Sequence, residues 1–280
     1  CSSDLVQISG CMDSQKVHLM WEAGETLPWK LVVTYDDSRA KEIYEDFRCF
    51  TDAVWLYPAK DLLFYNADIH GNLITRERLQ VLRHLMEDES GVVVTTMDGL
   101  MDHLLPLAFL QKQILEVGSG QTLDIAEWKE KLVELGYERV AQVDGMGQFS
   151  IRGGIIDVFP LTEELPVRIE LWDDEVDSIR TFDIESQRSI EELERVLVYP
   201  ATEMVLTKQQ IADGRESIEK EAKKYEKELR AQLKTEEAAR IHSIISELSD
   251  GLKEGWKQHG LDGYIHYFCR VTVACGKVYK

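Results

Sequence analysis

The first third of the chain alternates short apolar runs with amphipathic segments. Each run is mostly apolar, which indicates strands that are buried on both faces. These strands are predicted at residues 5–8, 29–35, 53–57 and 91–96. Apolar residues at helical spacing predict helices at residues 39–50, 74–86 and from about 98 onward. Asp36, Asp37 and Ser38 offer capping side chains for the first of these helices. This alternation predicts an α/β domain with a parallel sheet covered on both faces.

The pattern changes near Gln113. Gly118-Ser119-Gly120 marks a flexible break, and an amphipathic helix is predicted over residues 123–135, with its end at Gly136. Short strand-like segments with turn residues between them follow at residues 148–152, 154–159, 167–172 and 175–183. Short strands joined by tight turns favour an antiparallel sheet, so this part is predicted to be a small α+β domain.

Residues 208–258 are rich in Glu, Lys, Ala and Leu, with opposite charges at helical separations such as Glu219 with Lys223. They predict one or two long exposed helices. Sustained heptads are missing, which favours solvated helices packed on a neighbour over a coiled coil. Residues 264–273 are strand-like, and the tail at 270–280 indicates no function.

Three parts are therefore expected along the chain. Residues 1–112 form the α/β domain, and residues 113–199 form the α+β domain. Residues 200–280 form a mostly helical part that packs back on the first and is truncated at its C-terminal end. The chain opens at Cys1 without a methionine, which indicates a piece of a longer protein.

The net charge of the chain indicates which classes of partner it can bind. The chain has 51 carboxylates against 32 Lys and Arg residues, a net charge of -19, and duplex DNA binds to clustered cationic side chains. Autonomous DNA binding is therefore disfavoured, and basic protein partners are favoured. The odd number of cysteines forms no framework, which indicates free thiols in a reducing cytoplasm. These are Cys1, Cys11, Cys49, Cys269 and Cys275. No apolar run is long enough to span a membrane.

A damaged phosphate-binding motif follows the first predicted strand. The pattern G-x-x-x-x-G-K-[ST] is met by Gly10 and Lys16, but Gln15 replaces the second glycine and Val17 replaces the hydroxyl residue. A side chain at position 15 obstructs the approach of phosphate to the backbone, and valine cannot ligate Mg²⁺. The alternative is a chance match at a βα turn. Under either interpretation we expect no ATP hydrolysis and no cofactor. The histidines show no metal-ligand spacing.

The most distinctive segments are residues 147–160, GQFSIRGGIIDVFP, and residues 165–183, LPVRIELWDDEVDSIRTFD. With Ser186-Gln187-Arg188 and the residues 199–203, YPATE, they resemble the signature shared by the bacterial excision-repair protein UvrB and the transcription-repair coupling factor, Mfd. The resemblance covers nearly the whole chain, up to about Phe268. UvrB carries an intact phosphate loop and the coupling factor's N-terminal module a decayed one, so the chain resembles the coupling-factor module.

This resemblance implies a fold and a function. Residues 1–112 would be a RecA-like domain with a degenerate phosphate loop, and the module would be a non-catalytic docking platform. In the family it binds UvrA and recruits nucleotide excision repair to a stalled RNA polymerase. The ATP-dependent translocase motors and the parts that bind DNA and RNA polymerase lie further on and are absent here. A C-terminal domain, also absent, contacts this module and is expected to mask the UvrA surface.

Strand alternation identifies the candidate binding face. In residues 167–172 it places Val167, Ile169 and Leu171 on one face and Arg168, Glu170 and Trp172 on the other. In residues 148–152 it places Phe149 and Ile151 inward and Gln148, Ser150 and Arg152 outward. Arg and Trp side by side have the composition of an interface hot spot.

The resemblance implies that Arg152, Arg168 and Trp172 bind UvrA, with Arg180 at the edge of the same patch. The family usually has Phe at the position of Trp172. The alternative for each arginine is a structural ion pair with a nearby carboxylate. The alternative for Trp172 is packing against a neighbouring domain.

Two other functions stay open at this point. One is a nucleotide-dependent DNA-repair enzyme of the UvrB or helicase type, which Gln15 and Val17 argue against. The other is a DNA-gripping platform, which the net charge disfavours. Measurable ATP affinity would favour the first, and salt-sensitive duplex binding would favour the second.

Overall fold

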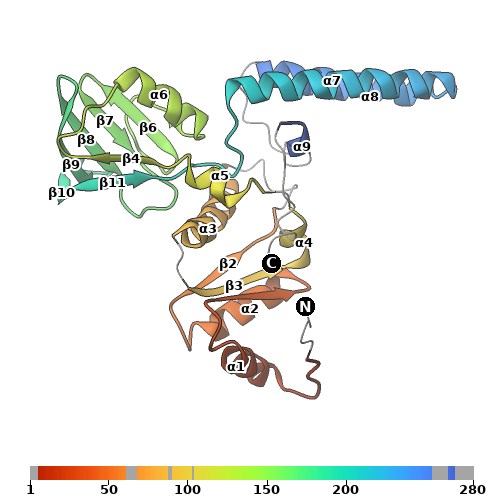
Figure 1. Cartoon of the computed structure of the whole chain (residues 1–280), viewed down its shortest axis with the longest axis horizontal. Helices are drawn as coiled ribbons and strands as arrows, with labels where there is room; N and C mark the ends of the chain where they lie inside the picture. Colours follow the sequence, from red (N-terminus) through yellow and green to blue (C-terminus); the bar gives the residue numbers. More distant parts are fainter. Residues whose placement is uncertain (1–5, 61–67, 88–89, 103, 254–263, 269–280) are drawn as a thin grey trace.

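The structure is a computed structural model that describes residues 6–60, 68–87, 90–102, 104–253 and 264–268. Figure 1 labels its elements in chain order. The helices are α1 (Asp13–Ala23), α2 (Asp37–Phe47), α3 (Asp68–Met86), α4 (Met97–Met101), α5 (Leu107–Gln111), α6 (Ile125–Glu134), α7 (Lys208–Ala231), α8 (Thr235–Lys253) and α9 (Ile265–Phe268). The strands are β1 (Trp29–Thr34), β2 (Val54–Tyr57), β3 (Gly91–Thr96), β4 (Leu115–Gly118), β5 (Glu138–Arg139), β6 (Gln148–Arg152), β7 (Ile155–Val158), β8 (Val167–Trp172), β9 (Glu175–Phe182), β10 (Ser189–Leu193) and β11 (Arg195–Val198).

The N-terminal part contains a parallel sheet of order β1-β3-β2, as the apolar runs predict. Helices cover both of its faces. Val92 and Val94 of β3 pack with α1 and α2 on one face, and Val93 packs with α3 on the other. Asp36 caps α2 as predicted, because its carboxylate accepts a hydrogen bond from the backbone N–H of Arg39 at 2.7 Å.

The strand predicted at residues 5–8 is not formed. Residue 5 lies outside the described residues, and Val6, Ile8 and their neighbours have no strand pairing and are exposed to solvent. A short apolar run becomes a strand only when it can pair with the edge of a sheet. Whether such an edge is available depends on residues far away in the sequence. The damaged phosphate motif therefore does not follow a strand in this structure. A RecA-like fold remains an inference from the resemblance.

The middle of the chain forms a six-stranded sheet of order β10-β9-β8-β7-β6-β5. Its neighbours pair antiparallel, as predicted, apart from the short parallel pair of β5 with β6. Helix α6 packs on one face, where Trp128 and Leu132 share a core with Ile156 and Ile169. The two-stranded ladder of β4 and β11 contributes to the same core. Gly136, with φ of +91°, ends the helical segment where expected.

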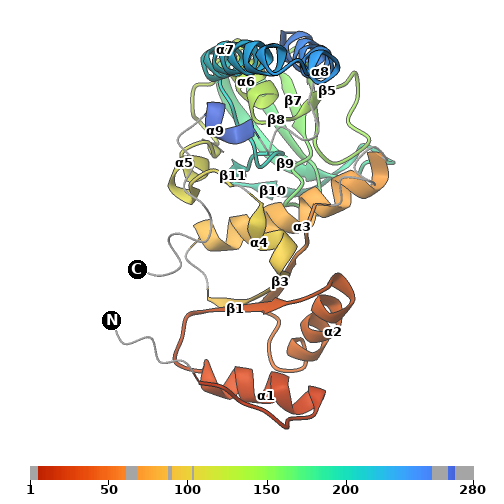
Figure 2. The ribbon, with the colours of Figure 1, turned by 90° about the vertical axis from the view of Figure 1, so that its right-hand side faces the viewer.

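Helix α3 belongs to both halves of the molecule. It lies between the parallel sheet and the six-stranded sheet in both views (Figure 2). Leu79 and Leu82 enter the core of the six-stranded sheet, whereas Val81 packs against the parallel sheet. The main core thus extends across residues 112–113, where the composition changes. The two halves are joined by shared packing and not only by a linker.

A buried ion network joins the same two halves. Arg78 of α3 is fully buried, and its guanidinium binds both carboxylate oxygens of Glu203, which follows β11. Arg78 also donates to Asp102 at 2.8 Å and to the hydroxyl of Tyr57, and Lys60 lies 3.1 Å from Glu203. A buried charge is tolerated only when such partners surround it. The network therefore fixes α3 against the segment after β11.

Helices α7 and α8 form an antiparallel hairpin that extends away from the body (Figure 1). The chain reverses at Leu233, whose φ is +61°. α7 also packs against α9, which is helical where a strand was predicted. Residues 265–268 bury Ile265 and Phe268 on a helical face, so the strand prediction is wrong there, and its remainder lies outside the described residues. Among the described helices, none is long and apolar enough to cross a membrane.

Gly214 allows the contact between α7 and α9. A Cβ atom built at this glycine would lie 2.2 Å from the ring of Phe268. We expect Gly214→Ala to destabilise the hairpin by about 1–3 kcal/mol, although alanine favours helix by about 1 kcal/mol, because the ring must move. Urea unfolding measures this effect, and the exposed substitution Ser217→Ala is the control. An increase in stability would show that the contact is not as tight as described.

Candidate protein-binding face

The outer face of the six-stranded sheet carries polar and charged side chains. Cross-strand pairs bring these residues together: Asp157 stands opposite Arg168, and Arg168 stands opposite Arg180. We call this set the polar face, and it consists of Ser150, Arg152, Asp157, Arg168, Glu170, Trp172, Ser178 and Arg180. The opposite face buries Val167 and Ile169 completely and Leu171 in part, as strand alternation predicts.

Trp172 is the most exposed part of the polar face. It ends β8, and the turn that follows contains Asp173 in the left-handed conformation, with φ of +60°. Trp172 is 81% exposed to solvent. The alternative in which Trp172 packs against a neighbouring domain is therefore wrong for the described part of the chain. A large exposed aromatic is costly to leave in water and is typical of a contact surface.

Asp157 of β7 holds two of the predicted arginines. Its carboxylate is almost fully buried and accepts from Arg152 Nη2 at 2.6 Å. The same carboxylate accepts from Arg168 Nε at 2.7 Å and from Arg168 Nη2 at 3.0 Å. The alternative of a structural ion pair is thus correct for both arginines, but it does not exclude binding. Arg152 remains 45% exposed and reaches the surface beside the β6–β7 turn.

Arg168 is much less accessible. Its side chain is only 14% exposed, it stacks over the ring of Phe182, and it donates to the side chain of Gln187 at 3.1 Å. The hydrogen bond to Asp157 raises the pKa of the Arg168 guanidinium above its ordinary value, so the group stays charged. Arg168 lies on the predicted face but is not accessible there, because a neighbouring carboxylate and an aromatic ring hold it against the sheet.

Arg180 and Ser150 also differ in how accessible they are to solvent. Arg180 is partly exposed, and its guanidinium lies 3.9 Å from Glu170, a weak contact that leaves it available. Ser150 lies on the outer face of the sheet, as predicted, but it is buried there and donates to the carbonyl of Ala141 at 2.9 Å. The segment before β6 covers this part of the face, whereas Arg152 and Trp172 stay accessible to solvent.

Sequence reasoning missed Asp157 and Gln187. Asp157 stands inside the apolar strand sequence Ile155-Ile156-Asp157-Val158. A carboxylate there must be paired, and this requirement could have identified it as a partner of an arginine. Gln187 carries no such signal, because its contact with Arg168 depends on the turn between β9 and β10.

The residues of the damaged phosphate motif lie around the start of α1. Gly10 is exposed with φ of +80°, and the Gln15 side chain accepts from the backbone N–H of Met12 at 3.1 Å. Lys16 donates to Asp13 at 2.9 Å, and this hydrogen bond holds the pKa of Asp13 below its ordinary value. Val17 is buried in the core under the parallel sheet. Lys16 is thus paired with Asp13, the N–H of Met12 is capped by Gln15, and a buried valine stands where the hydroxyl residue would be.

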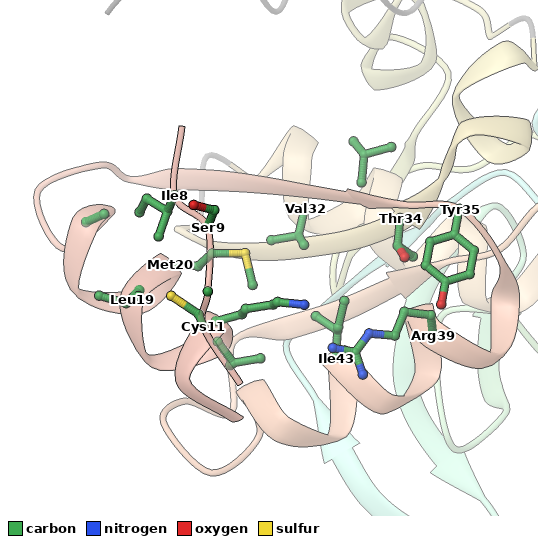
Figure 3. A pocket seen from close by; sticks show the side chains of 15 residues that line it. Ile8, Ser9, Cys11, Leu19, Met20, Val32, Thr34, Tyr35, Arg39 and Ile43 are labelled. Carbon is green, nitrogen blue, oxygen red and sulfur yellow. The ribbon is translucent and has the colours of Figure 1, made fainter. Parts of the chain in front are cut away.

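A groove of about 580 Å³ lies next to this segment (Figure 3). It is bounded by α1, the N-terminal segment and the edge of β1, and Met20, Val32 and Ile43 line it together with Arg39. Its volume is within the range of small-molecule sites, but the lining is mainly aliphatic. Arg39 is held by Asp13 at 3.0 Å and Glu42 at 2.7 Å.

We therefore expect no saturable ATP binding by the chain at millimolar nucleotide. Lys16→Ala should change nothing in an ATP titration followed by calorimetry, because the motif lacks its second glycine and its hydroxyl residue, and Lys16 alone does not make a phosphate site. Binding of ATP that is lost in Lys16→Ala would contradict this expectation and favour a nucleotide-dependent enzyme. In the described residues no group of His, Cys, Asp and Glu could hold a metal ion.

Comparison with known proteins identifies the class of domain that carries the polar face. Residues 115–204 match the family described as the UvrB interaction domain, a range that includes every member of the polar face.

The wider chain is similar to transcription-repair-coupling factors. It is 34% identical over 248 residues to that of Bacillus subtilis (strain 168), covering 88% of this chain and 21% of the relative. It is 33% identical over 214 residues to that of Staphylococcus aureus (strain USA300), covering 75% of this chain and 18% of the relative. The chain spans about a fifth of the length of these relatives. It is homologous to transcription-repair-coupling factors, and the predicted resemblance is confirmed.

Proposed function

We propose that this chain is a docking module that binds UvrA through the polar face. The observation that carries the proposal is Trp172, 81% exposed on the sheet face that also carries the accessible Arg152, within the residues that match the UvrB interaction domain. An aromatic anchor beside an arginine is the usual composition of an interface hot spot. UvrA itself is inferred from the resemblance to UvrB and the coupling factors.

Rigidity of the polar face supports the proposal. The ladders of β6, β7, β8 and β9 hold its residues in paired strands, with one register shift between Glu170 and Leu171, and Asp157 fixes Arg152 from below. A surface that is ordered before it binds loses less conformational entropy in the complex. Arg152, Trp172 and Arg180 are the accessible members, and Arg168 contributes mainly from beneath.

Under this proposal the module is non-catalytic. Residues 1–112 serve as a RecA-like support that has lost its phosphate loop, residues 113–199 carry the binding face, and residues 200–280 form the helical part. Recruitment of nucleotide excision repair to a stalled RNA polymerase would be the role of the longer protein. The resemblance implies that this role also uses further regions for DNA and RNA polymerase, and a C-terminal domain that contacts this module.

Size-exclusion chromatography of the chain with UvrA tests the proposal. We expect the two proteins to elute together, and the complex to be lost when Arg152→Glu and Trp172→Ala are combined. Circular dichroism of the double variant should be unchanged, because Trp172 is exposed and Asp157 keeps its two hydrogen bonds to Arg168 when Arg152 is replaced. Separate elution of the wild-type chain and UvrA would refute the proposal.

A further inference from the structure

We propose that Asp157 is a positioning residue of the polar face, and that Arg168 acts on binding through Asp157 without touching the partner. This inference rests on the proposed function and assigns different roles to the two arginines. Arg152 is then the direct donor to a partner carboxylate. Asp157 and Arg168 form the support that keeps Arg152 in place.

Counting hydrogen-bond donors separates the two arginines. A guanidinium has five N–H groups. Arg168 directs Nε and Nη2 to Asp157, Nη2 also to the Gln187 side chain, and Nη1 toward the Gln187 carbonyl at 3.4 Å. With 14% exposure it has little left to offer a partner. Arg152 donates through Nη2 to Asp157, and in the described part of the chain its other N–H groups have no protein acceptor.

The geometry of Asp157 suits a support. Its two oxygens accept three hydrogen bonds from two arginines, of 2.6, 2.7 and 3.0 Å, and its side chain is 1% exposed. Charge-assisted bonds of this length are stronger than neutral ones and fix the orientation of the planar guanidinium. Arg168 satisfies the carboxylate that would otherwise be buried with only one partner. Arg168 therefore holds Asp157 in position, and Asp157 in turn holds Arg152.

The groups that the polar face exposes also indicate which partner surface would be complementary to it. Arg152 presents free donors on the face that also exposes Trp172, and Arg180 adds a second cation to that face. The complementary patch carries one or more carboxylates beside an apolar recess that receives the indole ring. A partner patch of this kind can pair with Arg152 while Asp157 keeps its own bond, since a guanidinium offers donors on two sides.

Double-mutant cycles for UvrA binding by calorimetry test the inference. Asp157→Asn should weaken binding about tenfold in the wild-type background and leave it nearly unchanged in an Arg152→Ala background. Arg168→Met, which keeps an apolar side chain over Phe182, should behave in the same way. The inference would be overturned if Asp157→Asn and Arg168→Met weakened UvrA binding as much in the Arg152→Ala background as in the wild type. Such a result would indicate that Asp157 and Arg168 contact UvrA directly, or that the variants lose structure.

A second readout does not depend on UvrA. The heteronuclear NOE of the Arg152 Nε–H group should be that of an ordered side chain in the free wild-type protein. It should fall in Asp157→Asn and in Arg168→Met, while the NOE values of the backbone of β7 and β8 stay unchanged. A mobile Arg152 in the wild type, or an NOE that neither variant alters, would overturn the positioning role. If the wild type does not bind UvrA, the proposed function is refuted. The NOE measurement still tests whether Asp157 and Arg168 hold Arg152 in position.

Discussion

Replacing Trp172 by alanine should weaken binding to UvrA by about 2–4 kcal/mol, roughly 30- to 900-fold. The indole ring is the largest exposed apolar group on the polar face, and it stands at the end of β8 on the face that also carries Arg152. Covering it removes a large apolar area from water, whereas the truncated variant leaves the partner's recess unfilled. Calorimetric titration of the variant and the wild type against UvrA measures the difference.

Two matched variants sharpen this prediction. Trp172→Phe should retain most of the affinity, since it keeps an aromatic anchor and the family usually has Phe there. Tyr225→Ala removes another exposed aromatic, on the distant α7, and should leave binding unchanged. The stability of Trp172→Ala should stay within about 0.5 kcal/mol of the wild type, as for other surface substitutions. Equal affinity of Trp172→Ala and wild type would contradict the account of the polar face.

Glu203→Gln should destabilise the chain by about 3–5 kcal/mol. The substitution preserves shape but removes the negative charge that faces Arg78 and Lys60, all three being nearly inaccessible to solvent. Asp102 then remains as a carboxylate partner of Arg78, on the opposite side of its guanidinium. Because the network joins α3 to the segment after β11, urea unfolding should report a lower midpoint for both halves of the molecule.

The surface pair of Arg195 and Glu116 provides the control. Its atoms lie 3.5 Å apart and both side chains are well exposed, so Glu116→Gln should change stability by less than about 1 kcal/mol. If Glu203→Gln were no more destabilising than this control, the buried network would not hold the two halves together.

The same network predicts a dependence of stability on pH. Burial raises the pKa of Glu203, but the charges of Arg78 and Lys60 outweigh it, and the net pKa lies below its ordinary value of 4.5. A carboxylate with a lowered pKa stabilises the fold above the pKa of the unfolded chain, and this stability is lost as the pH falls through the folded pKa. Below about 4.5 the wild type should therefore lose stability more steeply than Glu203→Gln. Parallel curves for the two proteins would contradict this assignment.

Local pattern was enough to predict much of the fold. Residues 29–34 and 91–96 are strands because their β-branched residues suit a buried sheet, and both lie in the parallel sheet that the strand–helix alternation predicts. In β8 the period of two places Val167 and Ile169 inside and Trp172 outside. These features depend on neighbours along the chain, which the sequence displays directly.

Features that depend on distant partners were not predictable in the same way. Residues 6–9 have a strand-like composition but no strand beside them, and Ser150 is buried by a segment that crosses the sheet. The choice of Asp157 as the partner of Arg152 and Arg168 was hidden among 51 carboxylates. Pairing across a sheet fixes that choice, and strand register is set by the fold as a whole.

Hydrogen–deuterium exchange of the chain with and without UvrA tests the central claim most directly, because it reports where the partner covers the surface. We predict slower exchange in β6, in the turn to β7 and at the end of β8, around Arg152 and Trp172, with little change in α7 and α8. Protection confined to α1 and the edge of β1, or no protection anywhere at saturating UvrA, would contradict the account.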